Sequence, residues 1–248
     1  MLSAFLWGLI AASSLVVGGL LALWFTIGKR TLGAIMGFGA GVLISAVAYE
    51  LVFEAVHEAG LTMFPTLGFF VGAITFFVSD KLIGSMGAGE RKSVNASHQS
   101  SIVVPLVLGI ILDGIPESVV IGLGILGGGT VSLGMLVAVL ISNLPEGIAS
   151  TTGMRSGGWS SIKIISLWVL IAVVCAFASA AGYALCGGLS PQWLSFILTF
   201  SGGAILMMLA NTMMPEAYEH GGKLAGIFTV LGFAVSVWVI VLEHSGTI

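Results

Sequence analysis

Two similar motifs in the middle of the chain contain residue types that bind cations. One reads D-G-I-P-E-S at residues 113–118, and the other reads S-N-L-P-E-G at residues 142–147. In each motif a proline precedes a glutamate inside an apolar stretch of about twenty residues, the length of helix that spans a bilayer. The carboxylates should therefore lie at membrane depth, where ionisable side chains are rare and mark functional sites.

The two prolines should add backbone oxygens to this chemistry. Pro116 has no N–H group for the carbonyl of Leu112, and Pro145 has none for the carbonyl of Ile141. Each helix should therefore kink and leave one carbonyl unpaired at membrane depth, where its oxygen could bind a cation.

Small and polar residues recur at every fourth position around both glutamates, which places each set on one helix face. The rows are Gly109, Asp113 and Glu117 on the first segment and Gly134, Ala138, Ser142, Glu146 and Ser150 on the second. Because small side chains let helices approach closely, we expect the two segments to pack against each other. The result would be an oxygen-lined cation site near the bilayer midplane. Its expected ligands are Asp113, Glu117, Ser142, Asn143 and Glu146.

The composition of the chain is that of an integral membrane protein. Of its 248 residues, 57% are hydrophobic and 8% are charged, and the mean hydropathy is +1.13. This length allows eight transmembrane helices with short loops and leaves no room for a separate soluble domain. We therefore expect an all-α, polytopic membrane protein that forms one transmembrane domain over residues 1–248, with no nucleic-acid partner.

Apolar runs place the eight helices at about residues 3–27, 32–56, 66–84, 101–125, 130–154, 162–186, 193–217 and 223–244. All eight Lys and Arg residues follow odd-numbered spans, so they should lie on one side of the membrane. By the positive-inside rule that side is cytoplasmic, and both termini face outward. The expected location is the plasma membrane.

A second repeat relates the two ends of the chain. G-A-G-V-L-I-S-A-V-A-Y-E-L-V-F-E-A at residues 39–55 resembles S-G-G-A-I-L-M-M-L-A-N-T-M-M-P-E-A at residues 201–217. Spans two and seven thus look like copies, although they should cross the membrane in opposite directions. Spans one to three and six to eight would then form an inverted repeat around spans four and five, a 3+2+3 arrangement that is typical of transporters.

Acidic residues and histidines gather at one end of each copy. The first copy carries Glu50, Glu54, His57 and Glu58 at its outer end, and the second carries Thr212, Glu216, Glu219 and His220 at its inner end. These groups could be entrance and exit ligands for a cation that moves inward. The alternative is that side chains near helix ends simply reach interfacial water. Glu50 and Glu54 fit that alternative poorly. Glu50 lies more than a turn inside, where an unpaired charge costs several kcal/mol.

These features together resemble the ZIP family of divalent-metal transporters. The resemblance rests on the order of spans, the polar loop after span three, the G-F-G-A-G-V-L-I-S-A opening of span two, the paired P-E motifs and the M-M-P-E-A ending of span seven. It implies a homodimer in which spans one, four, five and six move as a bundle against spans two, three, seven and eight. It also implies metal-binding roles for Asp113, Gly114, Glu117, Ser142, Asn143 and Glu146.

The match to the family's motifs is partial. Asp113 and Ser142 stand where the family has histidines, and Gly114 stands where it has an asparagine. On span six, C-A-F-A-S-A-A-G-Y at residues 175–183 aligns with the family's E-P-L-G-A-L-L-G-Y, so Cys175 would replace a bridging carboxylate.

The substitutions leave several substrates open. Without imidazole, the site offers carboxylate, amide, hydroxyl and carbonyl oxygens, which suit Mn, Fe(II), Mg or Ca better than zinc. Carboxylates also bind zinc, and Cys175 could add a soft ligand, so zinc stays open. We expect a transporter that moves a divalent metal ion such as zinc, iron or manganese into the cytoplasm, with the metal as substrate and no cofactor. The alternatives are a carrier of a non-metal cation or proton-coupled solute and, as an enzyme, an intramembrane hydrolase with a carboxylate dyad.

Overall fold

The computed structural model describes residues 1–60, 62–85, 103–128 and 131–245, and within these ranges every regular element is a helix. Eight helices, two of them built from several consecutive elements, are long and apolar enough to cross a membrane. The elements are α1 (Leu2–Trp24), α2 (Lys29–Ala46), η1 (Val47–Phe53), α3 (Glu54–Ala59), α4 (Phe64–Ser85), α5 (Val103–Gly128), α6 (Leu133–Ser156), α7 (Ser161–Cys186), α8 (Pro191–Met208), η3 (Leu209–Met213), α9 (Met214–Gly221) and α10 (Lys223–His244), where η marks π-helical turns. The prediction of an all-α protein with eight spans is confirmed. Most of the polar loop expected at residues 84–101 lies outside the described residues.

Local sequence accounts for several helix boundaries. The Ser132 side chain accepts a hydrogen bond of 3.2 Å from the N–H of Met135 and so caps the start of α6. Spans two and seven each end at a glycine with positive φ, Gly60 at +66° and Gly222 at +57°, a conformation that other residues rarely adopt. These ends lie a few residues beyond the expected ones, because the polar tails of both spans remain helical.

The helices form two bundles. The first bundle contains α1, α5, α6 and α7, and the second contains α2, η1, α3, α4, α8, η3, α9 and α10. The most extensive packing lies within the bundles, between α4 and α8, α2 and α10, α1 and α6, α1 and α7, and α5 and α7. The bundles meet mainly where α6 packs on α2 and α5 packs on α8. The first bundle thus consists of spans one, four, five and six, and the second of spans two, three, seven and eight.

The second bundle contains the same close contact twice. In each case a glycine of one helix lies against a backbone carbonyl of the neighbouring helix. A glycine of that neighbouring helix likewise lies against a backbone carbonyl of the first. The pairs are Gly41 with Thr229 and Gly232 with Phe38 between α2 and α10, and Gly203 with Phe69 and Gly72 with Phe200 between α8 and α4. Gly41 and Gly203 occupy the same place in the repeated motif, and so do the first residues of the two π-helical turns.

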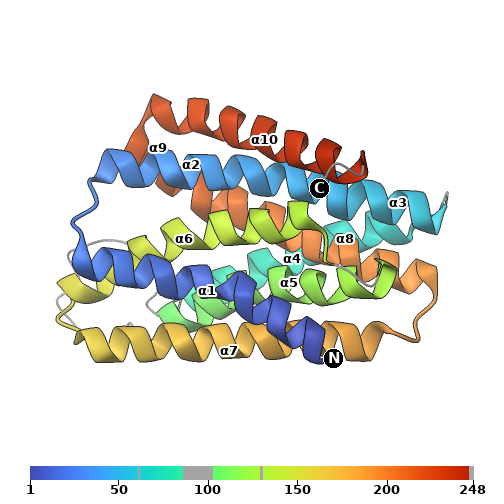
Figure 1. Ribbon diagram of the computed structural model, residues 1–248, viewed down its shortest axis with the longest axis horizontal. Coiled ribbons are helices and arrows are strands. Elements are labelled where there is room, and N and C mark those ends of the chain that lie inside the picture. The colour runs from blue at the N-terminus through green and yellow to red at the C-terminus, as the bar shows by residue number, and fades with distance from the viewer. Residues whose placement is uncertain (61, 86–102, 129–130, 246–248) are drawn as a thin grey trace.

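The two copies run in opposite directions, since α2 runs from left to right in Figure 1 and α8 from right to left. Matching contacts and opposite directions confirm the inverted repeat that the sequence predicted. The first bundle also contains close glycine contacts, although at positions that the two motifs do not share: Gly147 of α6 lies on the carbonyl of Leu15 in α1, and Gly122 of α5 lies on the carbonyl of Ser179 in α7.

The expected packing of spans four and five against each other is wrong. The helices α5 and α6 barely touch, because their small residues face other partners. Gly122 and Gly114 of α5 face α7, and Gly147 of α6 faces α1. Each of these glycines, which lie outside the two predicted rows, allows a close approach to a helix other than the second motif-bearing helix. Gly134, the first residue of the predicted row on α6, lies against Glu50 of η1. The two motifs are therefore not held together by close packing of α5 on α6.

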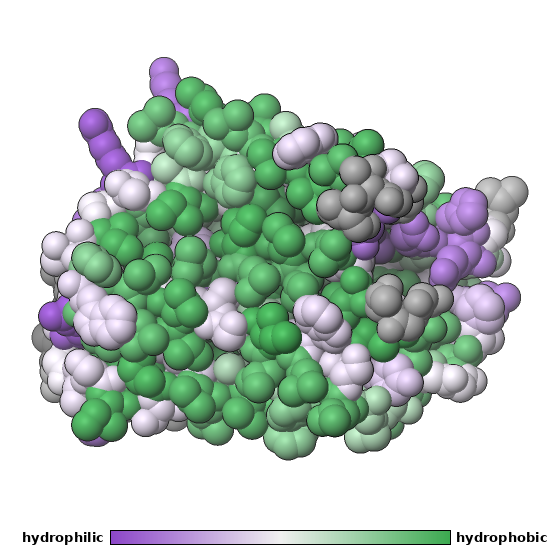
Figure 2. All heavy atoms as spheres, viewed as in Figure 1, coloured by the Kyte–Doolittle hydropathy of each residue, from purple (hydrophilic) through white to green (hydrophobic). Residues whose placement is uncertain are grey.

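Charged residues separate toward the two ends of the bundle, and apolar side chains cover the middle of the face seen in Figure 2. The described lysines and arginines lie near helix boundaries at one end, which we call the basic end: Lys29, Arg30, Lys81, Arg155, Lys163 and Lys223. The opposite end, called the acidic end, carries Glu54, Glu58 and Glu243. Arg91 and Lys92 lie outside the described residues.

Candidate cation site

Glu117, in the middle of α5, is the centre of the candidate site. Its side chain is only 2% exposed, and its Oε2 atom is buried with no hydrogen-bond partner among the described residues. Glu146 on α6 and Asp113, one turn earlier on α5, both interact electrostatically with it. Glu117 therefore lies within electrostatic range of the two other predicted carboxylates, although α5 and α6 make little contact. A buried, unpartnered carboxylate oxygen is costly, so a bound cation or proton would stabilise it.

Cys175 of α7 joins this cluster from a third helix. The thiol is buried, forms a side-chain hydrogen bond with Ser118, and lies within electrostatic range of Glu117 and Glu146. A Cβ atom at Gly114 would lie 2.9 Å from the Cys175 sulfur, so the glycine makes room for the thiol. The family alignment predicted the proximity of Cys175 to the site, whereas Ser118 was missed. The only signal for Ser118 was its place directly after the glutamate in the first motif.

On α6, Ser142 and Asn143 are both buried, as ligands of a deep site should be. The Ser142 hydroxyl donates a hydrogen bond of 3.1 Å to the Val139 carbonyl, which leaves its oxygen lone pairs available to a cation. Gly39 of α2 lies close by, since a Cβ atom there would be 3.2 Å from the Ser142 Cα and 3.3 Å from the Ile141 carbonyl oxygen. The site therefore lies at the junction of the two bundles.

The two prolines do not interrupt their helices, because α5 and α6 continue through Pro116 and Pro145. Within the described ranges, no three His, Cys, Asp or Glu side chains lie close enough together to hold one metal ion. A metal bound in this conformation would need neutral oxygens, such as those of Ser142 and Asn143, beside a carboxylate. Such a donor set fits a hard cation better than a soft one.

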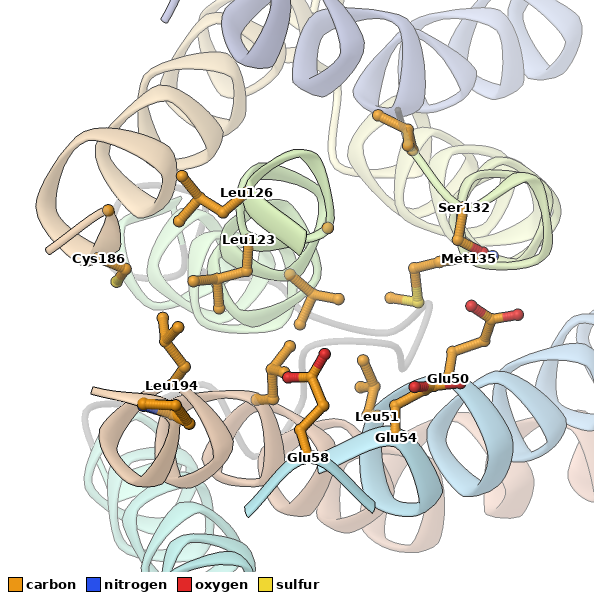
Figure 3. Close-up of a pocket in the computed structure, with 16 residues that line it drawn as sticks. Glu50, Leu51, Glu54, Glu58, Leu123, Leu126, Ser132, Met135, Cys186 and Leu194 are labelled. Atoms are coloured by element: carbon orange, nitrogen blue, oxygen red, sulfur yellow. Dashed lines mark hydrogen bonds between the residues drawn. The ribbon is translucent and has the colours of Figure 1, made fainter. Parts of the chain in front are cut away.

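A pocket of about 720 Å³ lies between the bundles at the acidic end (Figure 3). Three carboxylates from η1 and α3, those of Glu50, Glu54 and Glu58, lie on one wall, and the facing walls are mostly apolar. The other lining residues include Leu51, Val120, Leu123, Met135 and Leu198. Val120 is the lining residue of α5 nearest the middle of the bundle, and it lies one helical turn above Glu117. An apolar floor thus separates the pocket from the buried carboxylates.

Glu216 and His220 lie on α9 at the basic end, apart from both the pocket and the central carboxylates. Glu216 is buried, and within the described chain the Nδ1 atom of His220 is buried without a hydrogen-bond partner. Glu216 occupies the place of Glu54 in the repeated motif, so the two copies carry equivalent glutamates at opposite ends.

No protein-family model and no curated protein matches this chain.

Proposed function

We propose that the protein is a membrane transporter that moves a cation, most simply a divalent metal ion such as zinc, iron or manganese, across the bilayer. The observation that carries this proposal is the Glu117 carboxylate, buried at the junction of the two bundles with an unpartnered oxygen and two further carboxylates nearby. A packed structural core has no need for three acids at mid-depth, since each would cost free energy there.

The surroundings of the site support a transport role. The pocket at the acidic end ends at the apolar floor one helical turn from Glu117, and it carries three carboxylates that would concentrate cations. In transporters built from inverted repeats, rocking of one bundle against the other exposes a central site to each side in turn. Movement of the first bundle, within a homodimer in the plasma membrane, would carry Asp113, Glu117 and Glu146 together. With the acidic end outside, the net direction is into the cytoplasm.

A second candidate is a carrier of a non-metal cation or a proton-coupled solute on the same architecture. In the part of the chain that the structure describes, no three His, Cys, Asp or Glu side chains are arranged around one metal position. This observation favours the second candidate. An organic cation needs fewer direct ligands, and a carboxylate cluster can instead exchange protons.

A thermal-shift panel on the purified protein separates these candidates. The ligands are Mn, Fe(II), Zn, Co, Cd, Mg, Ca and a set of organic cations, and a ligand that binds the folded state at a hundredfold excess over its Kd should stabilise it by about 2.7 kcal/mol. We expect at least one divalent metal to raise the Tm, and this shift should vanish in Glu117→Gln and Glu146→Gln. An inert metal panel beside a stabilising organic cation would overturn the metal assignment and leave the architecture standing.

The direction of transport depends on which end of the bundle faces the cytoplasm. Ile162 lies at the basic end of α7 and is 80% exposed, and Leu185 lies at the acidic end of the same helix and is 77% exposed. A cysteine at each position therefore shows which side of the membrane that end of α7 faces. In a Cys186→Ala background, we expect Leu185→Cys but not Ile162→Cys to react with a membrane-impermeant thiol reagent applied to intact cells. The reverse pattern would place the basic end outside and reverse the proposed direction.

A further inference from the structure

The C-terminal end of α10 is bonded to the first turn of α6. The Glu243 carboxylate accepts a hydrogen bond of 3.0 Å from the N–H of Leu133 through one oxygen and one of 3.1 Å from the N–H of Gly134 through the other. The first N–H groups of a helix have no partner within the helix, and the positive end of the helix dipole favours an anion there. Both bonds have an ionised acceptor, so they belong to the stronger class of hydrogen bonds.

These hydrogen bonds join the two bundles, because α10 belongs to the second bundle and α6 to the first. A second carboxylate of the second bundle lies beside them: a Cβ atom at Gly134 would be only 2.6 Å from the Oε1 atom of Glu50. Glu50 and Ser132 line the pocket, so this contact forms part of the rim at the acidic end. Two acids of one bundle therefore approach the N-terminus of a helix in the other.

The repeat has a different kind of residue at the position equivalent to Glu243. The paired contacts of Gly72 with Phe200 and Gly232 with Phe38 align α4 with α10, and this alignment puts Ile83 in the place of Glu243. An isoleucine side chain cannot accept a hydrogen bond. The two access states of an inverted repeat exchange the roles of its halves. A bond that Glu243 forms and that Ile83 cannot form therefore favours one of the two states.

We propose that Glu243 is a conformational latch that holds the two bundles in the state with the pocket at the acidic end, and that its release is required for the bundles to move. This inference concerns the movement of the bundles and holds whatever the central site binds. A ligand or substitution that competes for the N-terminus of α6 would shift the equilibrium toward the other state.

Arg155 provides a matched control. Its guanidinium donates hydrogen bonds of 3.2 Å to the Ala22 carbonyl and 3.1 Å to the Leu23 carbonyl at the end of α1. This contact also joins a charged side chain to the backbone at a helix terminus, but α1 and α6 both belong to the first bundle. Its loss should therefore weaken the local structure without freeing one bundle from the other.

The test measures distances between spin labels on the purified protein in lipid nanodiscs by pulsed electron paramagnetic resonance. One pair, Leu185→Cys with Val241→Cys, links α7 and α10 at the acidic end, and the other, Ile162→Cys with Leu224→Cys, links the same helices at the basic end; all four positions are exposed. Cys186 is replaced by alanine, and buried Cys175 is retained. The pairs are compared in the otherwise native chain, in Glu243→Gln and in Arg155→Gln.

We expect Glu243→Gln to increase a second distance population about tenfold in both label pairs, equivalent to about 1.4 kcal/mol, while Arg155→Gln leaves both distributions unchanged. A change in the acidic-end pair alone would mean that Glu243 only holds the local end of α6, and this would overturn the proposal. Unchanged distributions in both pairs would overturn it as well. The Glu243→Asp variant, which retains the charge on a shorter side chain, should fall between the native chain and Glu243→Gln.

Discussion

Replacing Glu117 with glutamine is expected to lower cation flux by at least about a hundredfold, which corresponds to about 2.7 kcal/mol. The amide has nearly the shape of the carboxylate, so the packing around this buried side chain should persist. The charge that binds a cation is lost, and the remaining amide oxygen is a weaker ligand in a site that otherwise depends on Glu146 and Asp113. Glu146→Gln should have a similar effect. The measurement is uptake of the stabilising cation into sealed vesicles that contain equal amounts of reconstituted protein.

Glu58→Gln is the control for this prediction, because it removes the same charge from an exposed position at the rim of the pocket. Its flux should stay within about twofold of the native value, since exposed charges are well solvated and contribute little. Native-like flux in Glu117→Gln would show that the buried carboxylates do not bind the transported cation. An equal loss in Glu58→Gln would move the essential site to the pocket.

Much of the architecture could be predicted because it depends on patterns that are continuous along the chain. The eight spans follow from hydropathy, and the inverted repeat follows from the similarity of residues 39–55 and 201–217. The electrostatic interaction of Glu117 with Asp113 and Glu146 was also accessible, because acids deep within apolar segments have few favourable places except beside one another. Their assembly around one cation stays a prediction.

The contacts that could not be predicted connect distant helices. A row of small residues indicates that some helix approaches closely, but the sequence does not say which one. The rows that begin at Gly109 and Gly134 were therefore assigned to each other, whereas the close contacts of α5 and α6 are with α7 and α1. The hydrogen bonds of Glu243 were equally hidden. A glutamate at a helix end normally faces water, and its partners at Leu133 and Gly134 belong to a helix more than a hundred residues earlier. The π-helical turns also leave no mark in a pattern that is read with the α-helical period.

The largest effect on stability is expected at Gly41, where α2 packs against α10. A Cβ atom at this position would overlap the carbonyl oxygen of Thr229 and press on the backbone N of Phe233, 2.8 Å away. Both neighbours are backbone atoms of a regular helix, so they cannot move aside as the end of a flexible side chain could. Gly41→Ala must therefore push the two helices apart, and overpacking of this kind costs roughly 1–3 kcal/mol or more. Gly203→Ala should be about equally damaging, because it overlaps the carbonyl of Phe69 in the repeated contact.

Gly226→Ala on α10 is the matched control, since it adds the same methyl group to a helix position that has nothing within 4 Å. This variant should match the native chain or gain up to about 1 kcal/mol, because alanine favours the helix more than glycine does. Thermal unfolding of the purified proteins compares them, with Gly41→Ala and Gly203→Ala expected to lose several degrees in Tm and Gly226→Ala none. If only Gly41→Ala were destabilised, the two halves would not share the packing that their repeated sequence indicates. If neither were, the close contacts of α2 with α10 and of α8 with α4 would be wrong, and with them the second bundle against which the carboxylate site is proposed to move.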